Sequence, residues 1–252
     1  MSYVFGIRLA GKKIRIESQG KHVYEQCYDY LEEFDTPDYC IRADYNEILR
    51  EDMHKDVSLF KINKDGVAIT PSIDELEQLA ILRKIADALL CDGILLMHGA
   101  VVALNGFAYM FVAPSGVGKT TRIKLWMDEF PDSIVVNGDK PLIKITDSEV
   151  LVCGTPWCGK EGWNTNIQVP LHSIFILERA SQSIENNVKK LTFSQAFPAL
   201  LQQTNCDKTK ISTQRTIELL GSMSRKVNLY KFCSTPTADA IRMAYDVTRK
   251  VK

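Results

Sequence analysis

The segment from Ile94 to Met127 constrains the fold of this chain more than any other. Its first part, Ile94 to Ser115, carries no acidic or basic residue apart from His98. An apolar stretch of that length could span a bilayer. However, Asn105-Gly106 divides it, and Asn-Gly between two apolar runs is the strongest short-range signal for a β-hairpin. We therefore predict buried strands over 94–97, 100–104 and 107–112 instead of a membrane-spanning helix.

A loop rich in small residues follows the third of these strands. It reads Ala113-Pro114-Ser115-Gly116-Val117-Gly118-Lys119-Thr120-Thr121 and leads into a helical stretch. Phosphate-binding loops have the pattern G-x-x-x-x-G-K-[ST], and Ala113 replaces the first glycine, which is tolerated if its φ angle is negative. Gly116 and Gly118 let backbone amides surround an anion, and the helix directs its positive end towards it. The alternative is a strand-to-helix turn that binds nothing.

The loop assigns roles to particular side chains if it binds ATP. Residues 113–121 would hold the phosphates, with Lys119 reaching the β and γ phosphates and the Thr120 hydroxyl ligating Mg²⁺. A carboxylate at the end of a second strand completes such a metal site. Asp139, after the apolar run Ile134 to Val136, lies at a suitable distance along the chain. A structural cap at the strand end is the alternative for Asp139.

Two further features could belong to the same site. His98 ends an apolar run, where it could line the phosphate site, although a lone histidine in such surroundings is more often a core residue. The stretch Thr155 to Gly162 contains Lys160, which could offset phosphate charge, and Trp157, which could stack on a substrate. An ordinary solvated loop is the alternative for this stretch.

The composition limits the classes of function. The chain has 252 residues, 45% of them hydrophobic, which suffices for one large domain with a small lobe. Its 31 basic and 31 acidic residues cancel, which argues against bulk nucleic-acid binding. The seven cysteines show no paired C-x-x-C spacing, which is typical of reduced cytosolic thiols. The first residues show no signal peptide. We expect a cytoplasmic protein that binds neither nucleic acid nor a membrane.

Turn and capping signals divide the chain near residue 70. The segment 1–70 is predicted to be a small α+β lobe, with strands at 4–9, 13–17 and 39–42, a helix over 23–34, and a hairpin of 57–62 with 67–70. Ser72 to Glu75 is a capping box that opens a helix ending before Gly93. The segment 71–252 would form the second domain. Its further strands are predicted at 133–137, 142–145, 150–153, 173–177 and 228–233, and its later helices at 192–203, 211–224 and 237–251. An antiparallel hairpin precedes the phosphate loop, so we predict an α/β (α+β) fold with a mixed central sheet.

Four of these stretches together resemble a known family. They are Leu96-Met97-His98-Gly99, Asn105-Gly106, the loop 113–120, and Val136-Asn137-Gly138-Asp139. They are similar to the catalytic domain of HPr kinase/phosphorylase, whose wider relatives include the phosphoenolpyruvate carboxykinase fold and kinases of peptide natural-product gene clusters. The resemblance covers roughly Gly93 to Glu178. It implies use of ATP and Mg²⁺ and phosphoryl transfer to a serine-type hydroxyl, with His98, Lys119, Thr120 and Asp139 at the family's positions.

One departure from the family keeps three functions open. Gly138 occupies the place where relatives tend to have the first of two adjacent acids, the expected base. The first function is an ATP-dependent kinase acting on a hydroxyl-bearing peptide, protein or small molecule, with a precursor peptide as one candidate and HPr itself as a poor one. The second is a non-catalytic ATP-binding regulatory module. The third, a carboxykinase-like lyase, is disfavoured because Gly154 to Gly162 contains no arginine. A homo-oligomer is compatible with each.

Overall fold

The structure, a computed structural model, describes residues 2–53, 61–62, 68–69, 71–179, 186–206 and 209–249. The chain divides into two compact units, Met1–Ala88 and Leu89–Lys252. The predicted fold class is confirmed, because helices combine with a mixed sheet in the second unit and a small sheet in the first. The division after residue 70 that the sequence suggested differs from this one by most of α3 (Ile73–Leu90).

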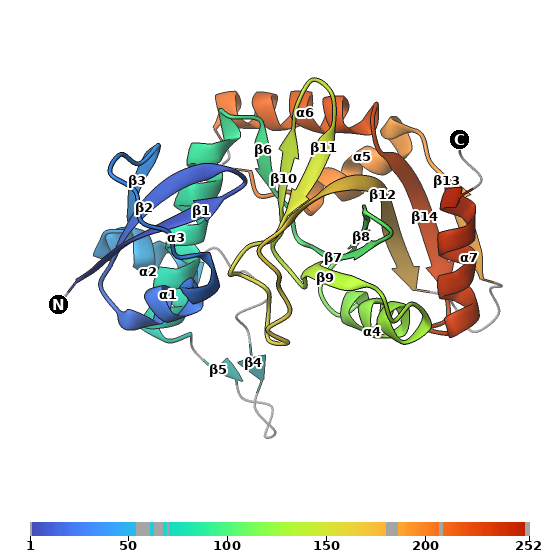
Figure 1. Ribbon diagram of the computed structural model, residues 1–252, viewed down its shortest axis with the longest axis horizontal. Coiled ribbons are helices and arrows are strands. Elements are labelled where there is room, and N and C mark those ends of the chain that lie inside the picture. Colours follow the sequence, from blue (N-terminus) through green and yellow to red (C-terminus); the bar gives the residue numbers. More distant parts are fainter. Residues whose placement is uncertain are drawn as a thin grey trace. The chain divides into compact units, whose positions relative to one another are not determined.

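The first unit contains a three-stranded sheet in the order β1-β2-β3 (Figure 1). Strand β1 (Tyr3–Leu9) pairs antiparallel with β2 (Lys12–Ser18), and β2 pairs parallel with β3 (Tyr39–Arg42). Alternate residues of β1 and β2 are buried, as expected for a sheet with one covered face. The three strands therefore lie where the sequence predicts them.

The helices of this unit differ from the prediction. The expected helix over 23–34 is replaced by α1 (Lys21–Gln26) and a 3₁₀ turn (Tyr28–Tyr30). The chain then leaves helical geometry because the amide of Glu32 donates to the carbonyl of Gly6 on β1, at 2.9 Å. A helix that was not predicted, α2 (Tyr45–Met53), follows β3.

Helix α3 begins at its predicted capping box, in which Ser72 and Glu75 exchange hydrogen bonds. Its first part belongs to the first unit because Glu77 accepts hydrogen bonds from the amides of Gln19 and Gly20, at 2.6 and 3.1 Å. Strands β4 (Lys61–Ile62) and β5 (Ala68–Ile69) pair antiparallel, and the rest of the hairpin predicted there lies outside the described residues.

The described residues of the second unit form a nine-stranded mixed sheet (Figure 1). Its main order is β6-β10-β11-β12-β8-β7-β9; β14 pairs with β12, and β13 pairs with β14. Strand β12 runs parallel to β8 and β14, and the other pairs are antiparallel. The strands are β6 (Ile94–Leu96), β7 (Gly99–Leu104), β8 (Phe107–Val112), β9 (Ile134–Asn137), β10 (Leu142–Ile145), β11 (Val150–Cys153), β12 (Gln168–Arg179), β13 (Asn187–Lys190) and β14 (Asn228–Ser234).

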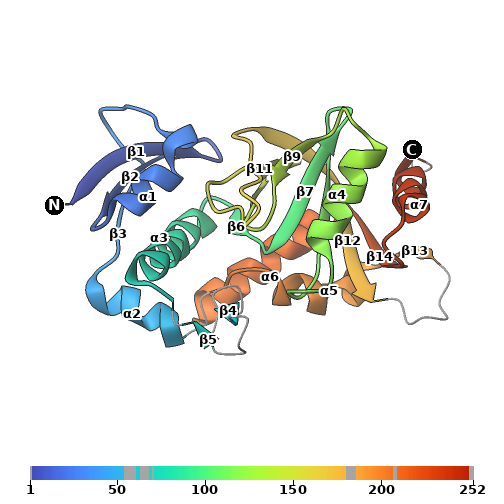
Figure 2. The same cartoon turned by 90° about the horizontal axis from the view of Figure 1, so that it is seen from below.

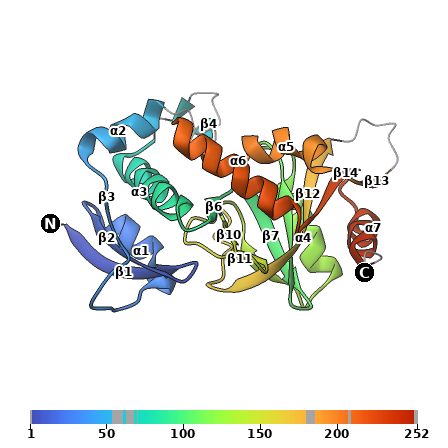
Figure 3. The same cartoon turned by 90° about the horizontal axis from the view of Figure 1, so that it is seen from above.

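Helices cover both faces of this sheet (Figures 1 and 3). On one face, α4 (Lys119–Glu129) and α7 (Ala238–Arg249) pack on a cluster that includes Val102 and Phe111, and α4 runs along β7 (Figure 2). On the other face, α5 (Phe193–Gln202) and α6 (Lys210–Ser224) pack on a cluster that includes Val101 and Met110. Burial on both faces explains why the strands from residue 94 to 112 are almost uninterruptedly apolar.

The interpretation of this apolar segment as strands is confirmed by β6, β7 and β8. Among the helices in the described part of the chain, none has the length and apolar character that crossing a membrane requires. All seven cysteines are free thiols.

Candidate phosphate-binding site

Strand directions bring the predicted site residues to one edge of the sheet. Strands β8 and β9 both run antiparallel to β7, so the carboxyl ends of β8 and β9 and the amino end of β7 share an edge. These ends carry the loop 113–118, Asp139 and His98. Strands β12 and β14 run parallel to β8, so Glu178 and Ser234 reach the same edge. Ligands of open α/β sheets bind at the carboxyl ends of strands, which makes this edge the candidate site.

The loop between β8 and α4 has the backbone expected of an anion cradle. Gly116 and Gly118 have φ angles of 77° and 107°, a region that side-chain-bearing residues adopt at a cost. No atom lies within 4 Å of the place where a Cβ of Gly118 would be, so this glycine is needed for its dihedral angle and not for space. Ala113 is not among the described residues with positive φ. The loop therefore accommodates Ala113 at the first position, as the sequence suggested.

The ammonium group of Lys119 is folded back onto this loop. Lys119 is the first residue of α4, is only 8% exposed, and donates a hydrogen bond to the carbonyl of Ala113 at 2.7 Å. Burial lowers the pKa of Lys119 to about 8, the nearby charge of Asp139 acts to raise it, and Lys140 lowers it further. A phosphate would offer this lysine a charged acceptor in place of a neutral carbonyl.

Asp139 and His98 form a hydrogen-bonded pair at the same edge. The distance from His98 Nε2 to Asp139 Oδ1 is 3.1 Å, and both side chains are partly exposed. Burial acts to raise the pKa of Asp139, but the hydrogen bond from His98 and the charges of Lys140, His98 and Lys119 together lower it. The amide of Gly99 donates to the Asp139 carbonyl, and that of His98 to the carbonyl of Gln203. His98 is thus paired with Asp139 at this edge and is not an isolated core histidine.

Asn137, buried at the end of β9, shapes the turn that presents Asp139. Its Oδ1 accepts hydrogen bonds from the amides of Asp139 and Lys140, at 2.8 and 2.7 Å. Its Nδ2 donates to the carbonyl and hydroxyl oxygens of Thr155. The sequence analysis did not identify Asn137 and Thr155 as positioning residues, although an asparagine two residues before a turn amide is a typical Asx-turn signal.

Gly138 leaves no space for a side chain, and so none for the acid expected there from the resemblance to HPr kinases. A Cβ on Gly138 would lie 2.8 Å from the carbonyl oxygen of Cys158 and 3.4 Å from that of Trp163. The Gly138 amide also donates to the Trp163 carbonyl at 2.9 Å. On the other side of the turn, a Cβ on Gly159 would lie 3.2 Å from Cβ of Asp139. The loop after β11 therefore packs backbone to backbone against the Asp139 turn.

This packing corrects one expectation about the loop. Trp157 is buried, with 4% of its surface exposed, so it does not present a ring on which a substrate could stack. Lys160 is exposed at the tip of the loop, where it remains a candidate for offsetting phosphate charge. Residues 155–158 at the base of the loop are buried and pack against the Asp139 turn, so the alternative interpretation of an ordinary solvated loop is wrong for this part.

A hollow of about 220 Å³ opens beside the phosphate loop. Gly118, Thr121 and Arg122 line one side of it, and Glu178 and the segment 234–236 line the other. The guanidinium group of Arg122 is buried and donates to the carbonyl oxygen of Ser234 at 2.6 Å, which ties α4 to the end of β14. Glu178 and Ser234 were not predicted as lining residues. The signal for each is a polar residue that directly follows an apolar run, at the carboxyl end of β12 or β14.

The donor atoms at this edge fit Mg²⁺ better than a metal held by protein alone. In the described part of the chain, no three His, Cys, Asp or Glu residues gather as metal ligands. Magnesium usually takes one or two protein oxygens and completes its shell with phosphate and water. The Thr120 hydroxyl and the Asp139 carboxylate, whose lowered pKa keeps it ionised, are oxygens of this kind.

Comparison with known proteins adds one structural similarity. No family model and no curated protein matches this chain. Among solved structures, it is similar to the Hpr(Ser) kinase/phosphatase from Coxiella burnetii, with a TM-score of 0.35 and 10% sequence identity. The similarity covers 62% of this chain and 94% of the other. A TM-score this low does not show that the two proteins share a function.

Proposed function

We propose that this protein is a Mg-ATP-dependent kinase that transfers the γ-phosphate to a serine-type hydroxyl on a peptide, protein or small molecule. The observation that carries the proposal is the buried ammonium group of Lys119, which lies against the glycine-containing loop 113–118 and interacts electrostatically with the Asp139 carboxylate. Phosphoryl transfer has a loose transition state, so its catalysis consists mainly of positioning and charge stabilisation. The edge of the sheet offers both.

Each group at the edge has a role in this proposal. The amides of the loop 113–118 and Lys119 hold the β and γ phosphates, and α4 directs its positive end at them. The hollow beside the loop accepts the nucleoside, where the Glu178 carboxylate can accept hydrogen bonds from ribose hydroxyls. Thr120 and Asp139 would hold Mg²⁺, which neutralises charge on the transferred phosphate.

The pair of His98 and Asp139 accounts for the missing acid at Gly138. If Nε2 of His98 donates its proton to Asp139, Nδ1 of the neutral ring is left as a hydrogen-bond acceptor. A substrate hydroxyl placed next to Nδ1 could pass its proton to the imidazole while its oxygen attacks the γ-phosphorus, the bond from that phosphorus to the β–γ bridging oxygen breaks, and ADP leaves. Asp139 then stabilises the imidazolium that forms.

One observation favours a second candidate function, an ATP-binding module without catalysis. The turn has no space for a second carboxylate at Gly138, so the base found in relatives cannot be present at this position. In that case the site would bind Mg-ATP and transmit its presence without transferring phosphate.

Transfer of labelled γ-phosphate from Mg-ATP separates the two functions. Candidate hydroxyl-bearing peptides and cell extract are offered to the wild type, Lys119→Ala and Lys124→Ala. Lys124 is a matched control because it is an exposed lysine on the same helix. The kinase proposal expects transfer by the wild type and Lys124→Ala and loss of transfer in Lys119→Ala. If the wild type binds ATP but transfers no label, the binding-module function is supported. If Lys119→Ala binds ATP and transfers phosphate as the wild type does, the assignment of the site to Lys119 and its loop is wrong.

A further inference from the structure

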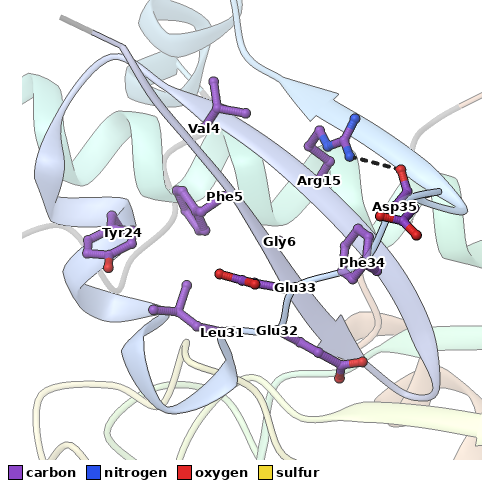
Figure 4. Close-up of a pocket in the computed structure, with 10 residues that line it drawn as sticks. All are labelled: Val4, Phe5, Gly6, Arg15, Tyr24, Leu31, Glu32, Glu33, Phe34 and Asp35. Carbon is purple, nitrogen blue, oxygen red and sulfur yellow. Dashed lines mark hydrogen bonds between the residues drawn. The ribbon is translucent and has the colours of Figure 1, made fainter.

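The first unit contains a hollow that the proposed kinase site does not use. It has a volume of about 490 Å³ and lies between β1 and the segment 31–35 (Figure 4). This volume is within the range of pockets that bind small molecules or single side chains. All of its lining residues belong to one compact unit, so its shape depends only on how that unit folds.

Aromatic rings form the walls of this hollow. The rings of Phe5 and Tyr24 stand nearly perpendicular, with an interplanar angle of 83° and centroids 5.3 Å apart. Phe34 lines the hollow over Gly6, and a Cβ on Gly6 would lie 2.8 Å from the Phe34 ring. The absent side chain therefore lets the segment 31–35 close onto β1, where the hydrogen bond from Glu32 to Gly6 fixes it.

A carboxylate extends into this aromatic space. In Figure 4, the side chain of Glu33 points towards Phe5 and Leu31, while that of Glu32 points the other way. Glu32 is already paired with Arg8, whose Nε donates to it at 2.6 Å. Within the part of the chain that the structure describes, Glu33 forms no ion pair. Glu33 is therefore a carboxylate available to a ligand.

The charge of the lining favours a cation. The lining contains three carboxylates, of which that of Glu32 is neutralised by Arg8, and one guanidinium group, that of Arg15. Arg15 donates to the backbone carbonyl of Asp35, at 3.3 Å, so its one printed hydrogen bond goes to a neutral acceptor and not to the Glu33 carboxylate. Aromatic faces attract cations through their quadrupoles, and a carboxylate adds a charge-assisted hydrogen bond. The chemistry matches a guanidinium or ammonium group.

The neighbouring edge of β1 indicates that the cation belongs to an extended chain. The carbonyl of Gly6 points away from β2, since it accepts a hydrogen bond from the backbone amide of Glu32. Peptide groups alternate along a strand, so those of Val4 point to the same edge, beyond the part of it that pairs with Leu31 and Glu32. Val4 is 63% exposed and lines the hollow. An extended segment that pairs with Val4 can place a side chain in the hollow.

We propose that this hollow binds an arginine or lysine side chain of an extended peptide that pairs with β1. The Glu33 carboxylate and the rings of Phe5 and Tyr24 recognise the cation, and the backbone of Val4 recognises the peptide. This site is independent of the proposed kinase function, because it lies in the other unit and uses none of the residues around Lys119.

Calorimetric titration of the full chain tests the site. The probe is the capped peptide Thr-Val-Arg-Val-Thr, compared with the same peptide carrying neutral citrulline and with free arginine amide. We expect the arginine peptide to bind about tenfold more tightly than the citrulline peptide, because citrulline keeps the shape and loses the charge. We also expect it to bind more tightly than arginine amide, which cannot pair with β1.

Two variants and a matched control locate the binding. Glu33→Gln is expected to weaken binding of the arginine peptide about tenfold, and Tyr24→Leu several-fold, since leucine keeps the bulk without the quadrupole. Glu25→Gln removes an exposed carboxylate of the same unit outside the lining and should leave binding unchanged. Equal binding of the arginine and citrulline peptides, or equal effects of Glu33→Gln and Glu25→Gln, would overturn the proposal. Equal affinity for arginine amide would overturn the pairing with β1.

Discussion

Replacing Gly138 with alanine tests why this position carries no acid. The new Cβ would lie 2.8 Å from the carbonyl oxygen of Cys158 and 3.4 Å from that of Trp163. Both neighbours are backbone atoms, which cannot rotate away as a flexible side chain can. Overpacking of this kind typically costs about 1–3 kcal/mol. For a chain of this size, a loss of about 2 kcal/mol lowers the unfolding temperature by roughly 4–8 °C.

Thermal unfolding followed by circular dichroism measures this effect, with Gly221→Ala as the control. Gly221 lies in α6, where an added Cβ meets only side-chain atoms at 4.0 Å. Alanine is the better helix former, so Gly221→Ala should stabilise the protein by about 0.5–1 kcal/mol. A Gly138→Ala variant as stable as the wild type would refute the steric argument. Gly138→Asp, which introduces the acid of the relatives, should then also fold normally, whereas we expect it to be destabilised and no more active.

Three further predictions concern charge and hydrogen bonding. The pKa of Lys119 is about 8 in the folded protein and near 10.5 in the unfolded chain. Between pH 8 and 10.5 the unfolded chain therefore binds more protons than the folded protein. The free energy of unfolding consequently rises with pH across this range. From pH 7.5 to 10, the unfolding free energy of the wild type should rise relative to that of Lys119→Met by on the order of 2 kcal/mol in urea denaturation. Asn137→Ala removes the acceptor of two turn amides and should cost about 2–3 kcal/mol, with faster hydrogen exchange at residues 139 and 140; Asn137→Asp keeps this acceptor but sets a buried carboxylate oxygen against the Thr155 carbonyl, so it should restore only part of the protection. Arg83→Ala leaves the buried Glu51 carboxylate without its 2.8 Å partner and should cost about 3–5 kcal/mol in chemical denaturation, and the same loss in Lys84→Ala would contradict this reasoning.

Elements with local signals could be predicted from the sequence. Strands β3, β8, β10 and β11 begin and end where their apolar runs and turn residues predict. The positions of the loop 113–118, His98 and Asp139 at one edge of the sheet could also be predicted, because each lies within two residues of an apolar strand. The missed helix α2 had a local signal too, since Asp44 and Glu47 cap each other's amides in the manner of a capping box.

Features that depend on distant parts of the chain could not be predicted. The reason for a glycine at 138 is the approach of Cys158, twenty residues later in the sequence. Glu178 and Ser234 join the site only because β12 and β14 run parallel to β8, and strand pairing cannot be read from either segment alone. The exposed, polar strand β13 lacks the apolar alternation by which strands are recognised.

The contact between the Asp139 turn and the loop after β11 restricts how this protein can diversify. Gly138 lies against the backbone at Cys158, and Gly159 lies against the Asp139 side chain, so a change in either segment acts on the backbone or on the carboxylate itself. A substitution at the base of the loop therefore displaces the carboxylate directly. The exposed tip, at Lys160, is free of this restriction. The tip can therefore vary in sequence without moving Asp139, whereas changes in the base and in the turn are coupled.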